Sequence, residues 1–469
     1  MSGIVSYGAY VPYWRLQRSA IAAVLGASGG RGTRAVASYD EDTTSMGVEA
    51  ARRAMAAAPA GSDVGSVYFS TVAPAYLDKT NATAIHAALG LRRSAGAYDL
   101  TGSVRSSVAA CTLAGNGSDL AVLSDLRVGL PGGSDEVNGG DGAAAILFGD
   151  GPGVIAGSIG GGSSTAEFLD RWRTPGDSTS RQWEERFGEF VYLPLVEEAI
   201  TDAYKSAGIT GGDVDHLIVA GLHTRAARGV AKLAGVRAEA VADDLSTAIG
   251  NTGLAHAAIV LADVLDRAEP GQVIAIVQLA DGADVWLLRV TDAITAYKSD
   301  RRQTTVREQI EAGRTDLPYA SFLTWRGFLD REPPRRPDPE RPAGPPAMRT
   351  EMWKFGFEGS RCTACGTRHL PPARVCVNCH ATDQMEPERL ADVPATIATY
   401  TIDRLAFSLS PPTIVVVIDF DGGGRFQCEM TDADPGKVAI GQRVQMTFRR
   451  LYTAEGVHNY FWKARPSAF

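Results

Sequence analysis

Asp141-Gly-Ala-Ala-Ala-Ile-Leu147 recurs in similar form 140 residues later, as Asp281-Gly-Ala-Asp-Val-Trp-Leu-Leu288. Both consist of a turn sequence followed by an apolar run that favours a β-strand. One match of this kind can arise by chance among common residues. The match indicates a duplication only if the sequence that precedes each copy matches as well.

Two further matches precede these strands in the same order. Val48-Glu-Ala-Ala51 and Val196-Glu-Glu-Ala199 each lie in an amphipathic helical pattern, about 150 residues apart. Each helical stretch leads through a short turn into an apolar strand, at 63–70 and at 213–220. We therefore predict a duplicated α/β unit over roughly the first 330 residues, with its two halves packed in layers around a shared site.

A proline-rich segment marks the end of this unit. Residues 331–350 contain seven prolines and eight charged residues, a composition that neither a helix nor a central strand tolerates. We predict a stiff spacer there. The expected organisation is the α/β unit at 1–330, the linker at 331–350, a cysteine-containing segment at 351–390 and a β-rich domain at 391–469.

The β-rich domain is predicted from short apolar runs that alternate with turns. Asp421-Gly-Gly-Gly424 and Asp434-Pro-Gly-Lys437 are two such turns, and the runs between the turns have the length of strands. About five strands at this spacing favour a small antiparallel barrel.

The composition is that of a soluble globular protein with an acidic balance. The chain has 469 residues, of which 45% are hydrophobic and 21% charged, and its net charge is −8. This charge argues against a general nucleic-acid binder or a basic membrane-surface protein. The long apolar run near residue 260 is interrupted by Asp263, and no signal-peptide pattern opens the sequence. We expect a cytoplasmic protein.

Four of the six cysteines form two C-x-x-C pairs. Cys362 and Cys365 make the first pair, Cys376 and Cys379 the second, with ten residues between the pairs. This spacing predicts a tetrahedral site of four thiolates for Zn²⁺, and a redox motif is the alternative. Because four thiolates leave no coordination position open, we expect the zinc to be structural. His369 and His380 flank the site, and the thiolates suffice without them.

The N-terminal unit resembles the thiolase superfamily, and within it the 3-hydroxy-3-methylglutaryl-CoA synthase and ketoacyl-ACP synthase III branch. The matching stretches are Ala37-Ser-Tyr-Asp-Glu-Asp42, Gly140-Asp-Gly-Ala-Ala-Ala145, His223 after an apolar run, and Gly250-Asn-Thr-Gly253. This resemblance implies a thiolase-like layered α/β fold.

The C-terminal part resembles the acyl-CoA-associated zinc-ribbon/OB-fold family. The matching stretches are Cys362-Thr-Ala-Cys-Gly366, Leu370–Cys379 and Tyr460-Phe-Trp-Lys-Ala-Arg-Pro466. The resemblance implies a zinc ribbon followed by an OB-type barrel. Separate proteins of this family assemble with thiolase-like enzymes, whereas here the two parts are joined in one chain.

The thiolase resemblance also implies a Cys–His–Asn constellation in which His223 and Asn251 face the thioester carbonyl. An imidazole N–H and an amide N–H aimed at that oxygen stabilise developing enolate charge. His223 follows an apolar run, at the carboxyl end of a strand, where the sites of α/β sheets gather. A structural histidine and a turn-forming asparagine are the alternatives for the two residues.

The nucleophile of that constellation is missing from its expected position. The family's cysteine follows the strand that here reads Ala97-Tyr-Asp-Leu100, which places it at Val104. Cys111 lies seven residues further, about 10.5 Å along a helix, and is expected to pack there. Ser103 is adjacent, but the sequence shows no base that would activate it. The family's general-base glutamate is also missing from the segment before Tyr76.

Three functions follow from these departures. The first is an acyl-CoA enzyme that makes or breaks a C–C bond beside the thioester by aldol or retro-aldol chemistry, without an acyl-enzyme. The second is a non-catalytic subunit that holds a thiolase or aldolase and passes CoA intermediates to it. The third is an HMG-CoA synthase-like acyltransferase with another nucleophile. We expect a homodimer, a thiolase-family protein as a further partner, coenzyme A as part of the substrate, and neither nucleic-acid binding nor membrane insertion.

Overall fold

The computed structural model describes residues 2–26, 30–300, 304–335, 337 and 339–467. The chain forms two compact units. The first consists of Met1–Ala37, Glu49–Thr83 and Arg93–Tyr319, and the second of Ser38–Val48, Ala84–Arg92 and Ala320–Phe469. Within the described ranges, no helix combines the length and the apolar character that a membrane crossing requires.

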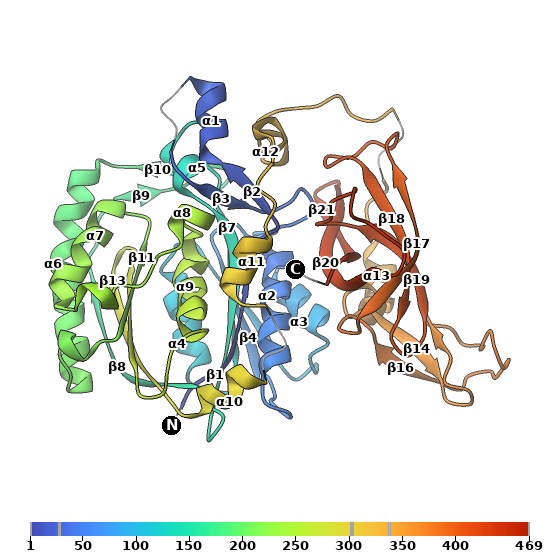
Figure 1. The fold of residues 1–469 in the computed structure, drawn as a ribbon, viewed down its shortest axis with the longest axis horizontal. Coiled ribbons are helices and arrows are strands. Elements are labelled where there is room, and N and C mark those ends of the chain that lie inside the picture. Colours follow the sequence, from blue (N-terminus) through green and yellow to red (C-terminus); the bar gives the residue numbers. More distant parts are fainter. Residues whose placement is uncertain (1, 27–29, 301–303, 336, 338, 468–469) are drawn as a thin grey trace. The chain divides into compact units, whose positions relative to one another are not determined.

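One sheet forms the framework of the first unit (Figure 1). Over the described residues it has nine strands in the order β11-β12-β13-β8-β1-β7-β6-β4-β5. Their bounds are β1 (Ser2–Tyr10), β4 (Ser66–Thr71), β5 (Gly96–Thr101), β6 (Leu120–Leu126), β7 (Asp141–Asp150), β8 (Ala156–Thr165), β11 (His216–Gly221), β12 (Val273–Leu279) and β13 (Gly282–Val290). Short two-stranded pairs lie beside it: β2 (Trp14–Gln17) with β3 (Thr33–Val36), and β9 (Arg171–Trp172) with β10 (Arg181–Gln182).

The two halves of this sheet repeat one strand order. In the N-terminal half, β4 runs parallel to β5 and β6, and β7 runs antiparallel to β6 and β1. In the C-terminal half, β11 runs parallel to β12, and β13 runs antiparallel to β12 and β8. The repeated strands that begin at Asp141 and Gly282 are β7 and β13, which hold equivalent places in the two halves. The predicted duplication is confirmed.

Helices cover both faces of the C-terminal half because its strands alternate in the direction of their side chains. On β12, Val273, Ala275, Val277 and Leu279 pack with α6 (Glu185–Ala207) and α7 (Thr224–Ala234) in one apolar cluster. Ile274 and Ile276 belong to a second cluster with α9 (His256–Leu265). Figure 1 shows α6 and α7 on the outer side of these strands.

The predicted helical stretches are confirmed as α2 (Thr43–Ala57) and α6, which contains Pro194. The remaining helices up to residue 325 are short. They are α1 (Arg18–Leu25), α3 (Ala82–Leu89), α4 (Ser106–Ala114), α5 (Ser134–Asn138), α8 (Ser246–Ile249), α10 (Ala293–Ser299), α11 (Val306–Ala312) and α12 (Tyr319–Trp325).

A closed barrel forms the core of the second unit, with the strand order β17-β18-β19-β21-β20. Its strands are β17 (Ala395–Asp403), β18 (Thr413–Phe420), β19 (Arg425–Met430), β20 (Arg443–Ala454) and β21 (Val457–Pro466). On β18, Ile414, Val416, Ile418 and Phe420 are buried, every second residue, as expected for a barrel wall. The pairing of β19 with β21 is parallel and closes an otherwise antiparallel barrel.

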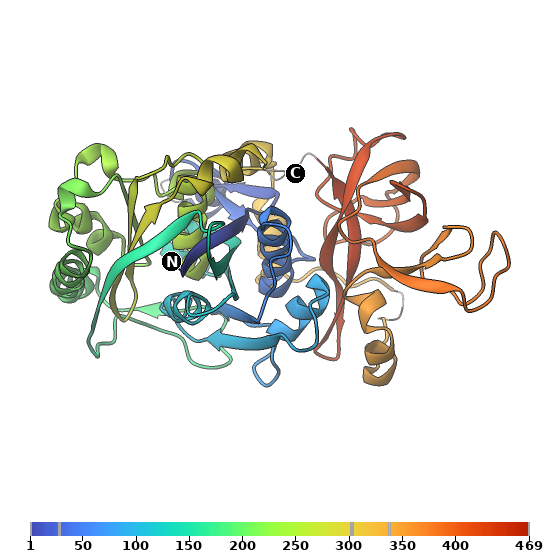
Figure 2. The same ribbon diagram turned by 90° about the horizontal axis from the view of Figure 1, so that it is seen from below.

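A small three-stranded sheet precedes the barrel: β14 (Glu358–Cys362), β15 (Arg368–His369) and β16 (Met385–Arg389). Figure 2 shows this cysteine-bearing segment projecting from the barrel. Two short helices, α13 (Gly344–Arg349) and α14 (Glu351–Lys354), come before it. The expectation of a helix-free linker at 331–350 is therefore wrong at α13. Pro345 and Pro346 lie in its first turn, where a proline costs no helical hydrogen bond.

Candidate functional site

A cavity of about 510 Å³ in the first unit brings the expected nucleophile position and the expected histidine together. Val104 and His223 both line it, from the segment before α4 and the segment between β11 and α7. The cavity therefore lies where the strands of the two halves end in connections to their helices. This is the place where α/β folds put their ligand sites.

The His223 side chain is held in one orientation by the helix it precedes. His223 is the N-cap of α7, and its Nδ1 accepts a hydrogen bond from the Ala226 backbone N–H at 3.1 Å. A nitrogen that accepts is unprotonated, so the neutral imidazole carries its proton on Nε2. The ring packs against Tyr192 of α6, with 5.7 Å between the ring centroids. In the neutral ring, Nε2 is therefore the donor nitrogen.

The residue at the expected nucleophile position cannot react covalently. Val104 is buried and precedes α4 by two residues, and its hydrocarbon side chain has no nucleophilic atom. Ser103 also lines the cavity, and its Oγ accepts a hydrogen bond from the Arg105 N–H at 3.2 Å. Cys111 lines a different cavity, and burial raises the pKa of its thiol to about 12. Such a thiol is protonated at neutral pH and is a weak nucleophile.

Asn251 does not line the cavity that His223 lines, because its amide is engaged with nearby backbone. Nδ2 donates to the Gly221 carbonyl at 2.8 Å, and Oδ1 accepts from the Gly253 N–H at 2.9 Å. Gly221 ends β11, two residues before His223. Asn251 therefore contacts the backbone that leads into His223, and the structure shows this link between the two predicted residues.

The two glycine-rich stretches of the family resemblance lie against each other around Asn251. The Gly140 N–H donates to the Asn251 carbonyl at 2.9 Å. A Cβ on Gly140 would lie 1.9 Å from the Ile249 carbonyl oxygen, and Gly250 has φ +76°. A side chain at Gly140 would clash with the neighbouring backbone. At Gly250, the positive φ disfavours any residue that has a side chain.

Asp170 and Tyr192 line the cavity, and the sequence did not predict a role for either residue. The Asp170 carboxylate lies close enough to the Tyr192 phenol to act on its pKa. Burial, followed by the negative charge of Asp170, raises the pKa of Tyr192 well above its ordinary value. Asp170 lies in a connection without a motif, and Tyr192 lies in a helical pattern, so neither carried a signal in the sequence. Asp170 supplies a carboxylate to the wall of this cavity.

The cavity is also lined by a partly buried cationic group, Arg171. Arg171 forms an ion pair with Asp135, while its Nη1 is buried and has no hydrogen-bond partner among the described residues. Burial, together with the nearby charge of Arg127, lowers the pKa of Arg171 from its ordinary value. Buried donors without partners are rare in folded proteins. Arg171 therefore offers a donor to an anionic or carbonyl oxygen of a ligand.

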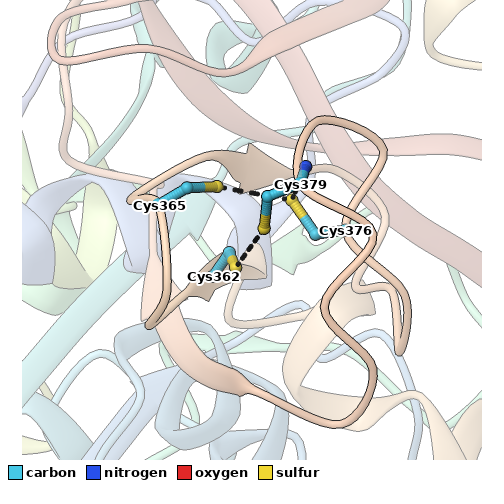
Figure 3. A group of neighbouring side chains, drawn as sticks. All are labelled: Cys362, Cys365, Cys376 and Cys379. Carbon is cyan, nitrogen blue, oxygen red and sulfur yellow. Dashed lines mark hydrogen bonds between the residues drawn. The ribbon is translucent and has the colours of Figure 1, made fainter.

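The four cysteines predicted to bind the metal form one cluster (Figure 3). The sulfur atoms of Cys362, Cys365, Cys376 and Cys379 all lie within 4.8 Å of one another. Among the residues that the structure describes, neither His369 nor His380 belongs to this group. The Cys379 N–H points at the Cys376 sulfur, at 3.5 Å. Four soft donors in this arrangement fit a tetrahedral Zn²⁺ with no position left for substrate.

A buried charge cluster occupies the second unit, where the stretch at residues 40–42 lies against β20. The Arg449 guanidinium contacts three carboxylates: Glu41 at 2.8 Å, Asp40 at 3.4 Å, and Asp432. Lys463 Nζ lies 3.0 Å from Asp40 Oδ2. Burial acts to raise the pKa of Asp40, but Lys463 and Arg449 outweigh it, so the pKa is lowered.

Curated relatives match the first two thirds of the chain. The chain is 33% identical over 345 residues to the hydroxymethylglutaryl-CoA synthase of Aeropyrum pernix, covering 70% of this chain and 95% of that protein. It is 30% identical over 348 residues to the enzyme of Archaeoglobus fulgidus, covering 70% and 98%.

Solved structures show the same fold in the first unit. A structure described as MvaS in complex with 3-hydroxy-3-methylglutaryl coenzyme A matches with a TM-score of 0.58 and 20% identity, over 72% of this chain and 94% of that chain. A 3-oxoacyl-(acyl carrier protein) synthase III from Pseudomonas aeruginosa matches with a TM-score of 0.56 and 20% identity, over 62% and 98%. These likenesses confirm the thiolase-like α/β fold.

Two family models match the C-terminal part. Residues 356–386 match the model described as ChsH2, rubredoxin-like zinc ribbon domain, and residues 388–449 match the model described as ChsH2, C-terminal OB-fold domain. The predicted zinc ribbon and OB-type barrel are thereby confirmed. The chain belongs to the hydroxymethylglutaryl-CoA synthase family and carries a ChsH2-type zinc ribbon and OB-fold at its C-terminal end.

Proposed function

We propose that this protein is an enzyme that makes or breaks a C–C bond beside an acyl-CoA thioester, by aldol or retro-aldol chemistry without an acyl-enzyme. The observation that carries the proposal is the pairing of Val104 with His223 in one cavity. The cavity keeps a donor for a thioester oxygen and lacks the nucleophile for a covalent intermediate. Coenzyme A enters as part of the substrate.

In the cleavage direction, a base removes the proton of a β-hydroxyl group on the acyl chain. The Cα–Cβ bond then breaks, a carbonyl forms at Cβ, and the electron pair moves into the thioester as an enolate. The Nε2–H of His223 donates to the enolate oxygen, where the negative charge develops. Protonation of Cα completes the reaction. The condensation direction uses the same steps in reverse.

Asp170 is the group that we assign as the base. It is a carboxylate of the cavity, and the Tyr192 phenol lies beside it. The raised pKa of Tyr192 keeps the phenol protonated at neutral pH, so Tyr192 supplies no negative charge of its own. Arg171, with its unpaired Nη1, is assigned to an anionic or carbonyl oxygen of the acyl group.

Val104→Cys tests whether the site still has the geometry of an acylating enzyme. A thiol at this position lies close to the N-terminus of α4, which favours the thiolate. We expect acetyl-CoA to leave one acetyl group on this variant, detected by the mass of the denatured protein. Ser103→Cys is the matched control, one residue away, and is expected to gain none. Wild-type protein is expected to release products from β-hydroxyacyl-CoA substrates and to gain no mass.

A substrate-dependent acyl adduct on the wild-type chain that is consumed as product forms would overturn the non-covalent mechanism. It would favour a synthase-like acyltransferase with another nucleophile. Turnover only in the presence of a co-purified thiolase or aldolase would favour the non-catalytic subunit. Acyl-CoA panels followed by mass spectrometry distinguish these outcomes.

We also propose that the chain is a homodimer through the first unit. β5 lies at one end of the sheet, and Tyr98 on it is 53% exposed, with its ring stacked on Tyr68. An exposed edge strand of this kind pairs readily with a second copy. Light scattering at micromolar concentration is expected to report twice the 49.6 kDa chain mass. A stable monomer would contradict the assignment.

A further inference from the structure

A second cavity, of about 660 Å³, lies in the first unit apart from the site assigned above. It is lined by α4, α9 and strands of both halves of the sheet. Its walls are mainly apolar, with Leu123, Ile146, Phe148, Leu254, Ile276 and Trp286 among them. Neighbouring residues of one short segment line the two cavities. Val104 lines the smaller cavity, and Ser107 and Val108, about one helical turn later, line the larger one. The volume is that of a small-molecule site.

One polar side chain inside this cavity has no partner. Gln278 is 3% exposed, and neither its Oε1 nor its Nε2 forms a hydrogen bond with the described residues. It follows Ile274 and Ile276 on the same face of β12, so its amide points toward the helices that line the cavity. A buried amide with both atoms unsatisfied is costly in a folded protein. A ligand that pairs with both atoms removes this cost.

Arg105 contacts a wall residue of each of the two cavities. Arg105 Nε lies 2.8 Å from Asp284 Oδ2, and its Nη1 donates to the Asp281 carbonyl at 2.9 Å. Asp284 lines the larger cavity and Asp281 the smaller. The guanidinium therefore bridges the walls of both cavities.

We infer that the larger cavity binds an apolar molecule that carries one hydroxyl group. The apolar walls accept the hydrocarbon part, and the hydroxyl both donates to Gln278 Oε1 and accepts from Nε2. A carboxylate accepts only, so it would place its charge against Oε1 and beside Asp284. A pure hydrocarbon would leave both amide atoms unsatisfied. The inference does not depend on the reaction proposed for the site of His223.

Binding of two probes of equal length tests the inference. Isothermal titration calorimetry of the full chain is expected to show binding of 1-octanol and weaker binding of 1-chlorooctane, whose halogen cannot donate. Gln278→Leu removes the amide at similar volume. We expect it to weaken 1-octanol binding about tenfold and to leave 1-chlorooctane binding unchanged or stronger. Equal effects on the two probes would overturn the role of Gln278.

Filling the cavity provides a second, independent test. Val108→Phe projects a larger side chain into the cavity and is expected to abolish binding of both probes. Ala109→Phe is the matched control, because Ala109 is exposed and does not line the cavity. If neither probe binds the wild-type chain at any concentration, the inference is wrong. If binding is seen only with monomers and disappears on dimerisation, a second copy covers the cavity and the inference is also wrong.

Discussion

Gly188 lies so close to His223 that a Cβ at position 188 would be 2.5 Å from the imidazole Nε2. Real Cβ atoms do not approach other atoms this closely, so a side chain here would displace the ring. Gly188 is buried in α6, whereas His223 precedes α7. The packing of one helix over the other therefore fixes the position of the proposed donor, together with the Ala226 N–H.

Gly188→Ala is expected to lower turnover about 100-fold, because a displacement of about 1 Å in a catalytic group has an effect of this size. Alanine is favoured over glycine within a helix, so loss of the fold is not the expected cause. Gly229→Ala is the control, since its Cβ would meet only the flexible side chain of Leu193. Steady-state kinetics and the NMR signals of the His223 ring distinguish displacement from unfolding. An unchanged ring signal in Gly188→Ala would refute this reading.

Asn251 is expected to act through His223, because its amide holds the Gly221 carbonyl and not a residue of the cavity wall. His223→Ala should reduce turnover by about 10² to 10³ through loss of one preorganised donor. Asn251→Ala should also reduce turnover, and the double variant should be no slower than His223→Ala alone. If the loss of turnover in the double variant equalled the product of the two single losses, Asn251 would be shown to contact the substrate directly.

Zinc is expected at about one ion per chain, measured by elemental analysis of freshly purified protein. Cys362→Ser should release the metal and destabilise the second unit, since metal-binding free energy in such sites is also folding free energy. Cys428→Ser is the control, because this cysteine lies on β19 outside the cluster. Near-ultraviolet circular dichroism reports the packing of the barrel aromatics. Retention of a full zinc complement in Cys362→Ser would contradict the assignment.

Arg449→Met is expected to destabilise the second unit by about 3 to 5 kcal/mol, because it leaves buried carboxylates without their shared partner. Glu41, Asp40 and Asp432 are the groups affected. Arg425→Met is the control: its ion pair with Asp419 is exposed on the same barrel, and its loss should leave the denaturation midpoint near that of the wild type. Guanidinium denaturation followed by tryptophan fluorescence measures both. Equal midpoints for the two variants would show that the buried cluster does not stabilise the unit.

Alkylation of Cys111 is expected to be slow at pH 8 and to rise about tenfold per pH unit up to pH 10. Burial raises the pKa of the thiol to about 12, so the thiolate fraction at pH 8 is about 10⁻⁴. The folded chain holds the thiol proton more tightly than the unfolded chain does. The contribution of this thiol to the free energy of unfolding therefore falls as the pH rises above the thiol pKa of the unfolded chain. Peptide mapping after iodoacetamide treatment measures the rate. Thr112→Cys, which places an exposed thiol on the same helix, should react rapidly by comparison.

Several features of the protein could be predicted from the sequence because they depend on neighbours in the chain. The two C-x-x-C pairs bring their sulfur atoms together through local turns, so the spacing alone predicted the cluster of Cys362, Cys365, Cys376 and Cys379. Alternation of apolar residues predicted the strands, since side chains of a strand point to opposite faces. The duplication followed from recurring turns such as those at Asp141 and Asp281.

The sequence did not reveal contacts between residues that are distant along the chain. Arg449 and Glu41 are separated by most of the protein, and no local pattern marks either residue as part of a buried cluster. The same holds for Gly188 against His223 and for Tyr192 beside Asp170. The family resemblance predicted that Asn251 faces the substrate. In the structure, its amide donates to the Gly221 carbonyl instead.

Turns, periodicity and ligand spacing act over a few residues, so the elements and the metal preference of the cysteines could be predicted from local sequence. Which side chains share a cavity depends on tertiary packing. The placement of Val104 with His223, and of Gln278 in an apolar cavity, depends on how strands and helices from both halves of the first unit pack. That packing is the sum of many weak contacts between distant residues, and no short stretch of sequence encodes it.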